Sequence, residues 1–265
     1  MSHAYTIIDA HAHIFPTKIA EKATTAIGRF YDIPMDHPIG SSEALLQSGE
    51  AIGVSRYLVS SAATTPAQVQ NINDYIHAEC LANPQLFGFG TLHPRMEDAE
   101  RELDRLCGMG LHGIKFHPDF QTFSIDEPDV IPLYRRIAEK KLPILFHMGD
   151  SRYEYSRPIR LQRVLEQVPE LTVIAPHFGG YERWEEAVEV LCHPNLYFDT
   201  SSALFKLSPD TAVEIIRHFG ADRFMFGSDF PMWDHAEELA RFLALPLTEQ
   251  EKEQILSKTF TTLFG

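Results

Sequence analysis

Eight short apolar runs separated by amphipathic stretches constrain the fold of this chain more than any other feature of its sequence. Each run is rich in Val, Ile, Phe or Tyr and nearly continuous in apolar character, which is typical of parallel strands buried on both faces. The predicted strands are Thr6–Asp9, Tyr57–Ser60, Phe87–Leu92, Gly113–Phe116, Pro143–His147, Thr172–Pro176, Leu196–Asp199 and Phe224–Gly227.

The stretches between these runs carry apolar residues at helical spacing. The predicted helices are Ser41–Ile52, Pro66–Ala82, Glu97–Met109, Asp129–Lys140, Ile159–Gln167, Tyr181–Leu191, Pro209–Phe219, His235–Leu243 and Thr248–Leu263. Strands that alternate with helices in this way predict an α/β fold of the (β/α)8 TIM-barrel type. The rival is an open doubly wound sheet, which usually has fewer strands, and the GxGxxG turn that would support it does not follow the first run.

The length of 265 residues suits one barrel, so we expect a single domain over residues 1–265. The stretch from about residue 15 to residue 40 has mixed composition and follows the first strand. We expect it to form an extended loop over the mouth of the barrel.

Charge and cysteine content exclude several classes of protein. The formal net charge of −14 argues against nucleic-acid binding, which needs clustered Lys and Arg. Three cysteines without a CxxC pair favour a reducing compartment, and the N-terminus has no secretory pattern. We therefore expect a cytoplasmic protein with no membrane span that acts on a small molecule, and a homodimer is compatible with the sequence.

The 13 histidines are not scattered evenly. Six lie at or just after the ends of predicted strands, where barrel enzymes place their chemistry: His11, His13, His93, His117, His147 and His177. Asp229 directly follows the last strand. The other seven lie on helices, loops or strand starts: His3, His37, His77, His112, His193, His218 and His235.

The pair His11 and His13 is the sharpest element of this pattern. Residues i and i+2 of a strand project to the same side, and two adjacent imidazoles are good ligands for a borderline ion such as zinc. Alone, the pair fits partly exposed strand-end histidines equally well. With His147, His177 and Asp229 at equivalent depths, the pattern matches a catalytic zinc site that keeps an open position.

Five segments together carry a family resemblance: HAHIF, GIKFHP, ILFHMGD, APHFGG and FGSDFP. They resemble the amidohydrolase superfamily, in the branch of metal-dependent hydrolases that includes aminocarboxymuconate-semialdehyde decarboxylase. The resemblance implies that His11, His13, His147 and Asp229 are metal ligands. It implies that His177 binds a second metal or serves the reacting water or substrate. We expect one divalent metal ion, Zn²⁺ with Mn²⁺ as the alternative, and no second metal.

Lys115 and His117 have two interpretations each. In binuclear members of the superfamily a carboxylated lysine bridges two metals, whereas Lys115 also fits a buried lysine paired with Asp9 or Asp229. His117, on the same side of the strand, could contact substrate or support a ligand. We place both residues in the substrate-binding set.

The implied chemistry is hydrolysis by a metal-activated water. Asp229 would accept and return the proton, and His177 would polarise the scissile carbonyl. The substrate would be a small, carboxylate-bearing amide, ester or lactone; the alternative is non-oxidative decarboxylation of an unsaturated or aromatic acid. In the loop GDSRYEYSRP, Arg152 could hold a carboxylate and Tyr153 a flat apolar surface, unless the loop is an ordinary solvated one. A metal-free lyase or a non-enzymatic metal-binding protein would not need this whole ligand set.

Overall fold

A computed structural model describes residues 5–265, so His3 lies outside the described part of the chain. The chain divides into two compact units: unit 1 comprises Met1–Val59 and Asp199–Gly265, and unit 2 comprises Ser60–Phe198. The expectation of one domain over the whole chain stays a prediction.

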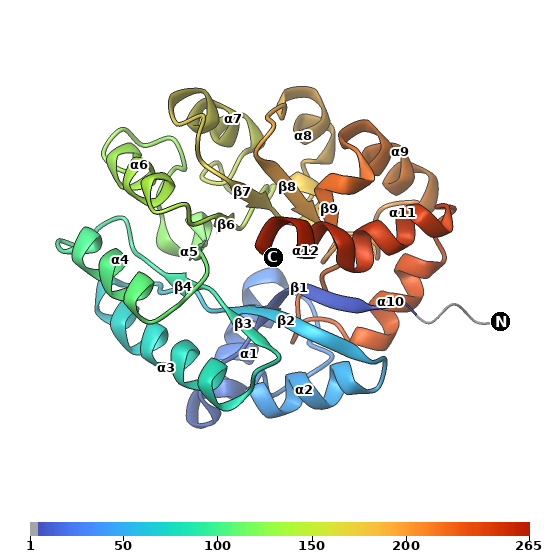
Figure 1. Ribbon diagram of the computed structural model, residues 1–265, viewed down its shortest axis with the longest axis horizontal. Helices are drawn as coiled ribbons and strands as arrows, with labels where there is room; N and C mark the ends of the chain where they lie inside the picture. The colour runs from blue at the N-terminus through green and yellow to red at the C-terminus, as the bar shows by residue number, and fades with distance from the viewer. Residues whose placement is uncertain (1–4) are drawn as a thin grey trace. The chain divides into compact units, whose positions relative to one another are not determined.

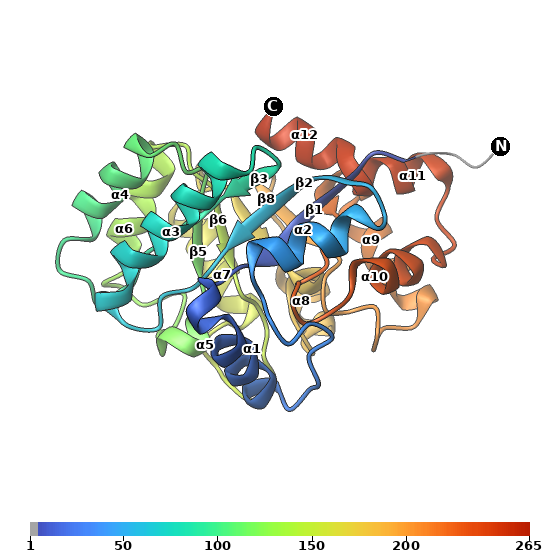
Figure 2. The same ribbon diagram turned by 90° about the horizontal axis from the view of Figure 1, so that it is seen from below.

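Unit 1 combines the first and the last parts of the described chain. Its strands are β1 (Ile7–His13), β2 (Val54–Ser60, which ends at the boundary) and β9 (Phe224–Met225). Its helices are α1 (Thr17–Tyr31), α2 (Ser42–Glu50), α9 (Pro209–Phe219), α10 (His235–Leu243), α11 (Glu249–Glu253) and α12 (Thr259–Phe264), with a 3-10 helix at Ala221–Arg223 and a π-helix at Gln254–Lys258. Figure 2 shows α1 at the end of this unit toward which β1 runs, and α11 and α12 at the opposite end.

Unit 2 contains a series of consecutive short strands. They are β3 (Leu86–Gly88), β4 (Gly90–Thr91), β5 (Ile114–Phe116), β6 (Ile144–Phe146), β7 (Val173–Ala175) and β8 (Leu196–Asp199, which ends at the boundary). Strands β4 to β8 lie in chain order in one sheet, and each pair is parallel. The helices are α3 (Val69–Ala82), α4 (Ala99–Gly108), α5 (Pro118–Gln121), α6 (Ile131–Glu139), α7 (Pro158–Gln167) and α8 (Trp184–Val190), with 3-10 helices at Pro66–Gln68 and His177–Gly179. Figure 1 shows α3, α4 and α6 on the outer side of these strands.

The strands carry the apolar residues that the sequence assigned to them. Ile114, Phe116, Phe146 and Val173 are all fully buried, which explains why the runs do not alternate between apolar and polar residues. The third predicted strand, Phe87–Leu92, is interrupted at Phe89, so it forms the two short strands β3 and β4.

The segment after β1 differs from the extended loop that we expected. Residues Thr17–Tyr31 form the helix α1, whose buried residues are Ala20, Thr24 and Gly28. These residues recur every four positions but are all small, so the buried side of α1 lacks the large apolar residues by which a helix is recognised in a sequence.

Candidate functional site

Three of the residues predicted as metal ligands lie together in unit 1. His11 and His13 are on β1, and Asp229 lies shortly after β9. The Asp229 amide donates a hydrogen bond to the His11 carbonyl (2.8 Å), and the His13 amide donates to the Phe230 carbonyl (2.7 Å). A parallel bridge joins Ala12 to Phe230. This pairing brings the end of β1 beside the segment that follows β9.

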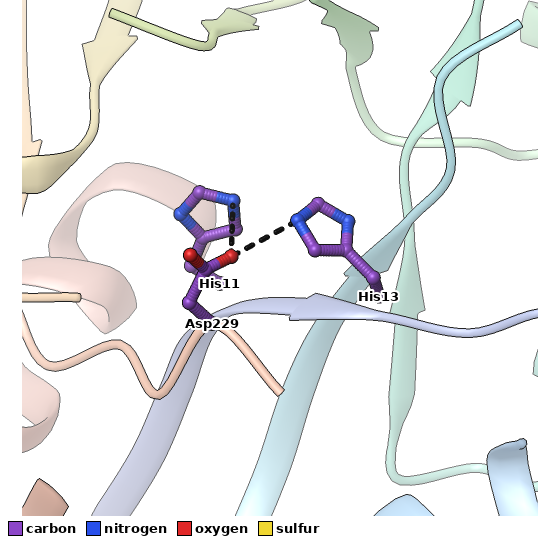
Figure 3. Close-up of side chains that lie close together, drawn as sticks. All are labelled: His11, His13 and Asp229. Atoms are coloured by element: carbon purple, nitrogen blue, oxygen red, sulfur yellow. Dashed lines mark ion pairs between the residues drawn. The ribbon is translucent and has the colours of Figure 1, made fainter. Parts of the chain in front are cut away.

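One carboxylate oxygen of Asp229 faces both imidazoles. Asp229 Oδ1 is 3.1 Å from His13 Nε2 and 3.6 Å from His11 Nε2, and the three donor atoms all lie within 4.8 Å of one another. Figure 3 shows this oxygen between the two rings and the second oxygen turned away from them. The His11 side chain is 0% exposed, that of Asp229 5% and that of His13 16%, so the group is reached from the His13 side.

Asp199 determines which nitrogen of His11 carries its proton. Asp199 Oδ1 accepts from the Ser201 amide (3.0 Å) and the Ser201 hydroxyl (2.5 Å), while its Oδ2 lies 2.9 Å from His11 Nδ1. Ser201 Oγ also lies 3.1 Å from His11 Nδ1, but its proton goes to Asp199. Because a carboxylate only accepts, Nδ1 must be the donor to Asp199. A carboxylate behind a metal-binding histidine orients it in this way in many metal sites.

The consequence is that His11 Nε2 presents a lone pair to Asp229 Oδ1. Two acceptors that face each other in a buried site need a proton or a cation between them, because both have been removed from water. Two imidazole nitrogens and a carboxylate oxygen suit zinc and manganese alike. The residues in unit 1 therefore fit a divalent metal ion.

Asp9 fastens the two segments that carry this group. Its Oδ1 accepts from the amides of His11 (3.0 Å) and Ser228 (2.9 Å), and its Oδ2 accepts from the Ser228 hydroxyl (2.6 Å). The His235 Nε2 atom lies 3.0 Å from the same Oδ2, and Asp9 and His235 are fully buried. Asp9 thus joins β1 to the segment after β9 from behind the candidate ligands.

In unit 2, three predicted site histidines form a second group. Phe116 pairs with Phe146 in the register of β5 and β6, so the next residues, His117 and His147, follow side by side. Their rings stack with centroids 4.0 Å apart. His147 Nδ1 lies 3.2 Å from His177 Nε2, and the Trp184 indole N–H donates to the His177 carbonyl (2.9 Å).

A buried carboxylate accompanies this group. Asp119 Oδ2 accepts a hydrogen bond from the Ser156 hydroxyl (2.7 Å) and lies 4.0 Å from His147 Nε2. Its Oδ1 has no hydrogen-bond partner among the described residues. Burial, with a smaller contribution from the neighbouring Asp150 carboxylate, raises the pKa of Asp119 to about 7, although the Ser156 hydrogen bond acts in the opposite direction.

The remaining predicted residues also lie in unit 2. Lys115 is buried on β5, two residues before His117, and its carbonyl accepts a hydrogen bond from Thr91. Arg152, with a side chain 43% exposed, forms two hydrogen bonds to the buried carboxylate of Asp150, and its guanidinium lies 5.5 Å from the Tyr153 ring centroid. The Asp150 carboxylate therefore already balances the charge of Arg152, and its binding of a substrate carboxylate stays a prediction.

Several residues around Asp229 and His177 adopt left-handed backbone conformations. The φ angles are +59° at Asp229, +48° at Ser202, +58° at His177 and +57° at Phe178. Such conformations are costly for residues other than glycine and cluster at functional sites, where the surrounding structure holds them. Their positions here coincide with the two groups of candidate residues.

Sequence reasoning missed Asp199, Asp119 and the two serines that follow Asp199. Asp199 ends the predicted strand Leu196–Asp199, and an acidic residue at the carboxyl end of a barrel strand is a signal that could have found it. Asp119, Ser201 and Ser202 carry no such signal, because the contact of Asp119 depends on the loop that holds Ser156, and the two serines lie in a loop themselves.

Comparison with known proteins shows which family the chain belongs to. A family profile described as "Amidohydrolase" matches residues 8–265, nearly the whole chain. The chain belongs to the amidohydrolase family. It is therefore an enzyme of that superfamily, as the motifs around His11, His147, His177 and Asp229 predicted. A search of curated proteins found no match.

Solved structures with the same fold cover almost the entire chain. A TIM-barrel protein from Bordetella bronchiseptica is 21% identical, with 97% of this chain and 98% of that chain covered and a TM-score of 0.77. A 5-carboxyvanillate decarboxylase from Sphingomonas paucimobilis is 16% identical (98% and 99% covered, TM-score 0.75). A dihydroxybenzoic acid decarboxylase from Polaromonas sp. JS666, with bound manganese and the inhibitor 2-nitroresorcinol, is 14% identical (98% and 97% covered, TM-score 0.75). These likenesses confirm the predicted (β/α)8 barrel fold. Over residues 5–265, the chain forms no helix long and apolar enough to span a membrane.

Proposed function

We propose that this protein is a metal-dependent, non-oxidative decarboxylase of an aromatic or unsaturated acid. Two of the similar structures are decarboxylases of aromatic acids, and one of them contains manganese. The observation that carries the proposal is the pair of acceptors, His11 Nε2 and Asp229 Oδ1, facing each other 3.6 Å apart. That pair of acceptors supports the metal ion, and the likeness to the two decarboxylases is the reason to prefer the alternative of the sequence prediction to hydrolysis.

The proposed ligands are His11, His13 and Asp229, with His147 added from the sequence pattern. One divalent ion is proposed, and the mixed nitrogen and oxygen donors accept Mn²⁺ as well as the predicted Zn²⁺. A divalent ion bound there would supply positive charge that polarises a substrate oxygen and stabilises negative charge.

Decarboxylation breaks the bond between the carboxyl carbon and its neighbour. The electron pair stays on the neighbouring carbon, carbon dioxide leaves, and a proton must reach that carbon. We propose that Asp229 takes up this proton from solvent and delivers it to the carbon, because its carboxylate lies beside His13, the most exposed of the three proposed ligands in unit 1. His177, with its Nε2 3.2 Å from His147 Nδ1, is proposed to stabilise the negative charge that develops on the substrate.

Hydrolysis of an amide, ester or lactone is the second candidate, and the family description favours it. The two reactions need different substrates: a decarboxylase consumes a free acid, and a hydrolase consumes its ester or amide. Matched pairs of hydroxybenzoic acids and their methyl esters separate the two activities in one experiment. The protein is assayed loaded with Mn²⁺ or Zn²⁺ and after treatment with EDTA.

We expect metal-dependent release of carbon dioxide in a 1:1 ratio with the acid consumed. In D₂O the product should carry one deuterium at the former carboxyl position. Asp229→Asn should lose this activity. Consumption of the esters, with no carbon dioxide from any of the acids, would replace the proposal by hydrolysis.

A further inference from the structure

Ser202 and Trp233 form a chain of hydrogen bonds that ends on Asp229. The Trp233 indole Nε1 lies 2.8 Å from Ser202 Oγ, and Ser202 Oγ lies 2.5 Å from Asp229 Oδ2. We propose that Ser202 and Trp233 are positioning residues that hold Asp229 as a one-oxygen ligand for the metal ion. This inference rests on the proposed metal site and concerns how that site is assembled.

The direction of the two hydrogen bonds is unambiguous. An indole N–H is a donor only, so the Ser202 oxygen accepts from Trp233. The single proton of the Ser202 hydroxyl then goes to Asp229 Oδ2. A hydroxyl that donates to a carboxylate forms a short, strong hydrogen bond, in keeping with the distance of 2.5 Å.

The indole ring is itself held in place. The Phe205 ring centroid lies 4.6 Å from that of Trp233, and the Arg241 guanidinium lies 5.1 Å from the indole centroid. Arg241 in turn forms ion pairs with Glu237 and with Glu238, whose side chain is 1% exposed. The indole N–H is therefore aimed at Ser202 by packing and charge.

Hydrogen bonds on both sides hold the backbone of Asp229, so its carboxylate can move only by rotation about the two side-chain bonds. The amide is bonded to the His11 carbonyl, and the carbonyl accepts from the Met232 amide (3.0 Å). Ser202 occupies Oδ2, so Oδ1 is the oxygen that faces His11 and His13 (Figure 3). Without the Ser202 proton, either oxygen or both could turn toward a bound cation.

The adjacent serines thus act on two different ligands. Ser201 supports Asp199 behind His11, whereas Ser202 orients Asp229. Supporting partners of this kind typically contribute about 10–100-fold to metal affinity or activity.

The first test measures Zn²⁺ affinity of the full-length, EDTA-treated protein by competition with a chromogenic chelator. Ser202→Ala and Ser202→Gly should both weaken binding by about 10–100-fold. The glycine variant relieves the left-handed conformation at φ +48°, so an equal loss in both variants assigns the effect to the hydroxyl. Trp233→Phe keeps an aromatic ring but removes the N–H, and should give a smaller loss. Ser208→Ala, which removes the serine cap of α9, controls for lost stability and should bind Zn²⁺ normally.

The second test follows the indole N–H itself. The chain has two tryptophans, so a ¹H–¹⁵N spectrum contains two indole signals, and Trp233→Phe identifies the one from Trp233. Addition of Zn²⁺ to the apo-protein should shift this signal, because the hydrogen-bond chain connects it to a ligand. In Ser202→Ala the Zn²⁺-induced shift should be lost or strongly reduced.

The outcomes separate this inference from the proposed function. If the wild-type protein binds no Zn²⁺, the proposed metal site is wrong and the inference falls with it. If the wild-type protein binds Zn²⁺, but Ser202→Ala and Ser202→Gly bind it equally well or more tightly, the metal site stands and the positioning role is overturned.

Discussion

Substitution of Asp199 by asparagine tests the orientation of the proposed metal ligand His11 without changing the shape of the side chain. Two donors of Ser201, its amide and its hydroxyl, point at Asp199 Oδ1. In Asp199→Asn the amide oxygen must therefore occupy that position, which places the NH₂ group against His11 Nδ1. His11 Nδ1 then becomes an acceptor, and the ring proton moves to Nε2.

The magnitude follows from this change of tautomer. A protonated Nε2 has no lone pair for a metal ion, so each binding event requires the disfavoured tautomer and leaves the asparagine N–H facing a donor. Removal of a carboxylate behind a metal-binding histidine typically costs about 10–100-fold in affinity, or about 1.4–2.8 kcal/mol. We expect Asp199→Asn to lie at the upper end of this range, because it reverses the hydrogen bond rather than deleting it.

Competition with a chromogenic chelator measures the Zn²⁺ affinity, and circular dichroism verifies the fold. Asp126→Asn is a matched control: this carboxylate pairs with Arg160 and Arg163, so its loss should affect stability but not metal binding. Wild-type affinity in Asp199→Asn would refute the reasoning about the His11 tautomer, while the metal site itself would stand.

Four further substitutions have defined outcomes. His147→Ala should lower both metal content, measured by atomic emission, and activity; full metal content would remove His147 from the ligand set. Asp229→Asn should abolish turnover but lose less of the bound metal than His147→Ala does, and unchanged turnover would exclude Asp229 as the proton donor. Burial raises the pKa of Glu238 to about 7, so the wild-type protein loses stability as pH rises from about 4.5 to 7. In urea unfolding at pH 8, the free energy of unfolding of Glu238→Gln should exceed that of the wild type by up to about 2–3 kcal/mol, with no such gain at pH 4.5. A difference that does not depend on pH would contradict the raised pKa. Ser41→Ala removes the cap of α2, since Ser41 Oγ accepts from the Ala44 amide (3.2 Å), and should cost about 1 kcal/mol with Zn²⁺ affinity unchanged; a loss of affinity would mean that α2 supports the site.

The strands and the histidines at their ends could be predicted because both leave chemical patterns in the sequence. Strands buried on both faces must be apolar throughout, and parallel strands bring their carboxyl ends to one edge, so that His117 and His147 are neighbours once Phe116 pairs with Phe146. The pair His11 and His13 was predictable from the two-residue period of a strand.

Other features depend on interactions that no local pattern records. Helix α1 buries only the small residues Ala20, Thr24 and Gly28, so no large apolar residue marks its buried side in the sequence. The partner of Arg152 is set by the turn that places Asp150 beside it. The contact of Asp119 depends on the loop after β6, which holds Ser156, and the role of Ser202 depends on the loop after β8. Such contacts join residues from loops whose conformation is decided by packing rather than by propensity.

The central claim is that His11, His13 and Asp229 hold one divalent metal ion. The most direct measurement is an anomalous difference map from crystals of the protein grown with Zn²⁺, recorded at the zinc absorption edge. A single strong peak is predicted about 2.0–2.2 Å from His11 Nε2, His13 Nε2 and Asp229 Oδ1. A map with no peak at these three atoms would contradict the claim, whether or not zinc is bound elsewhere in the crystal.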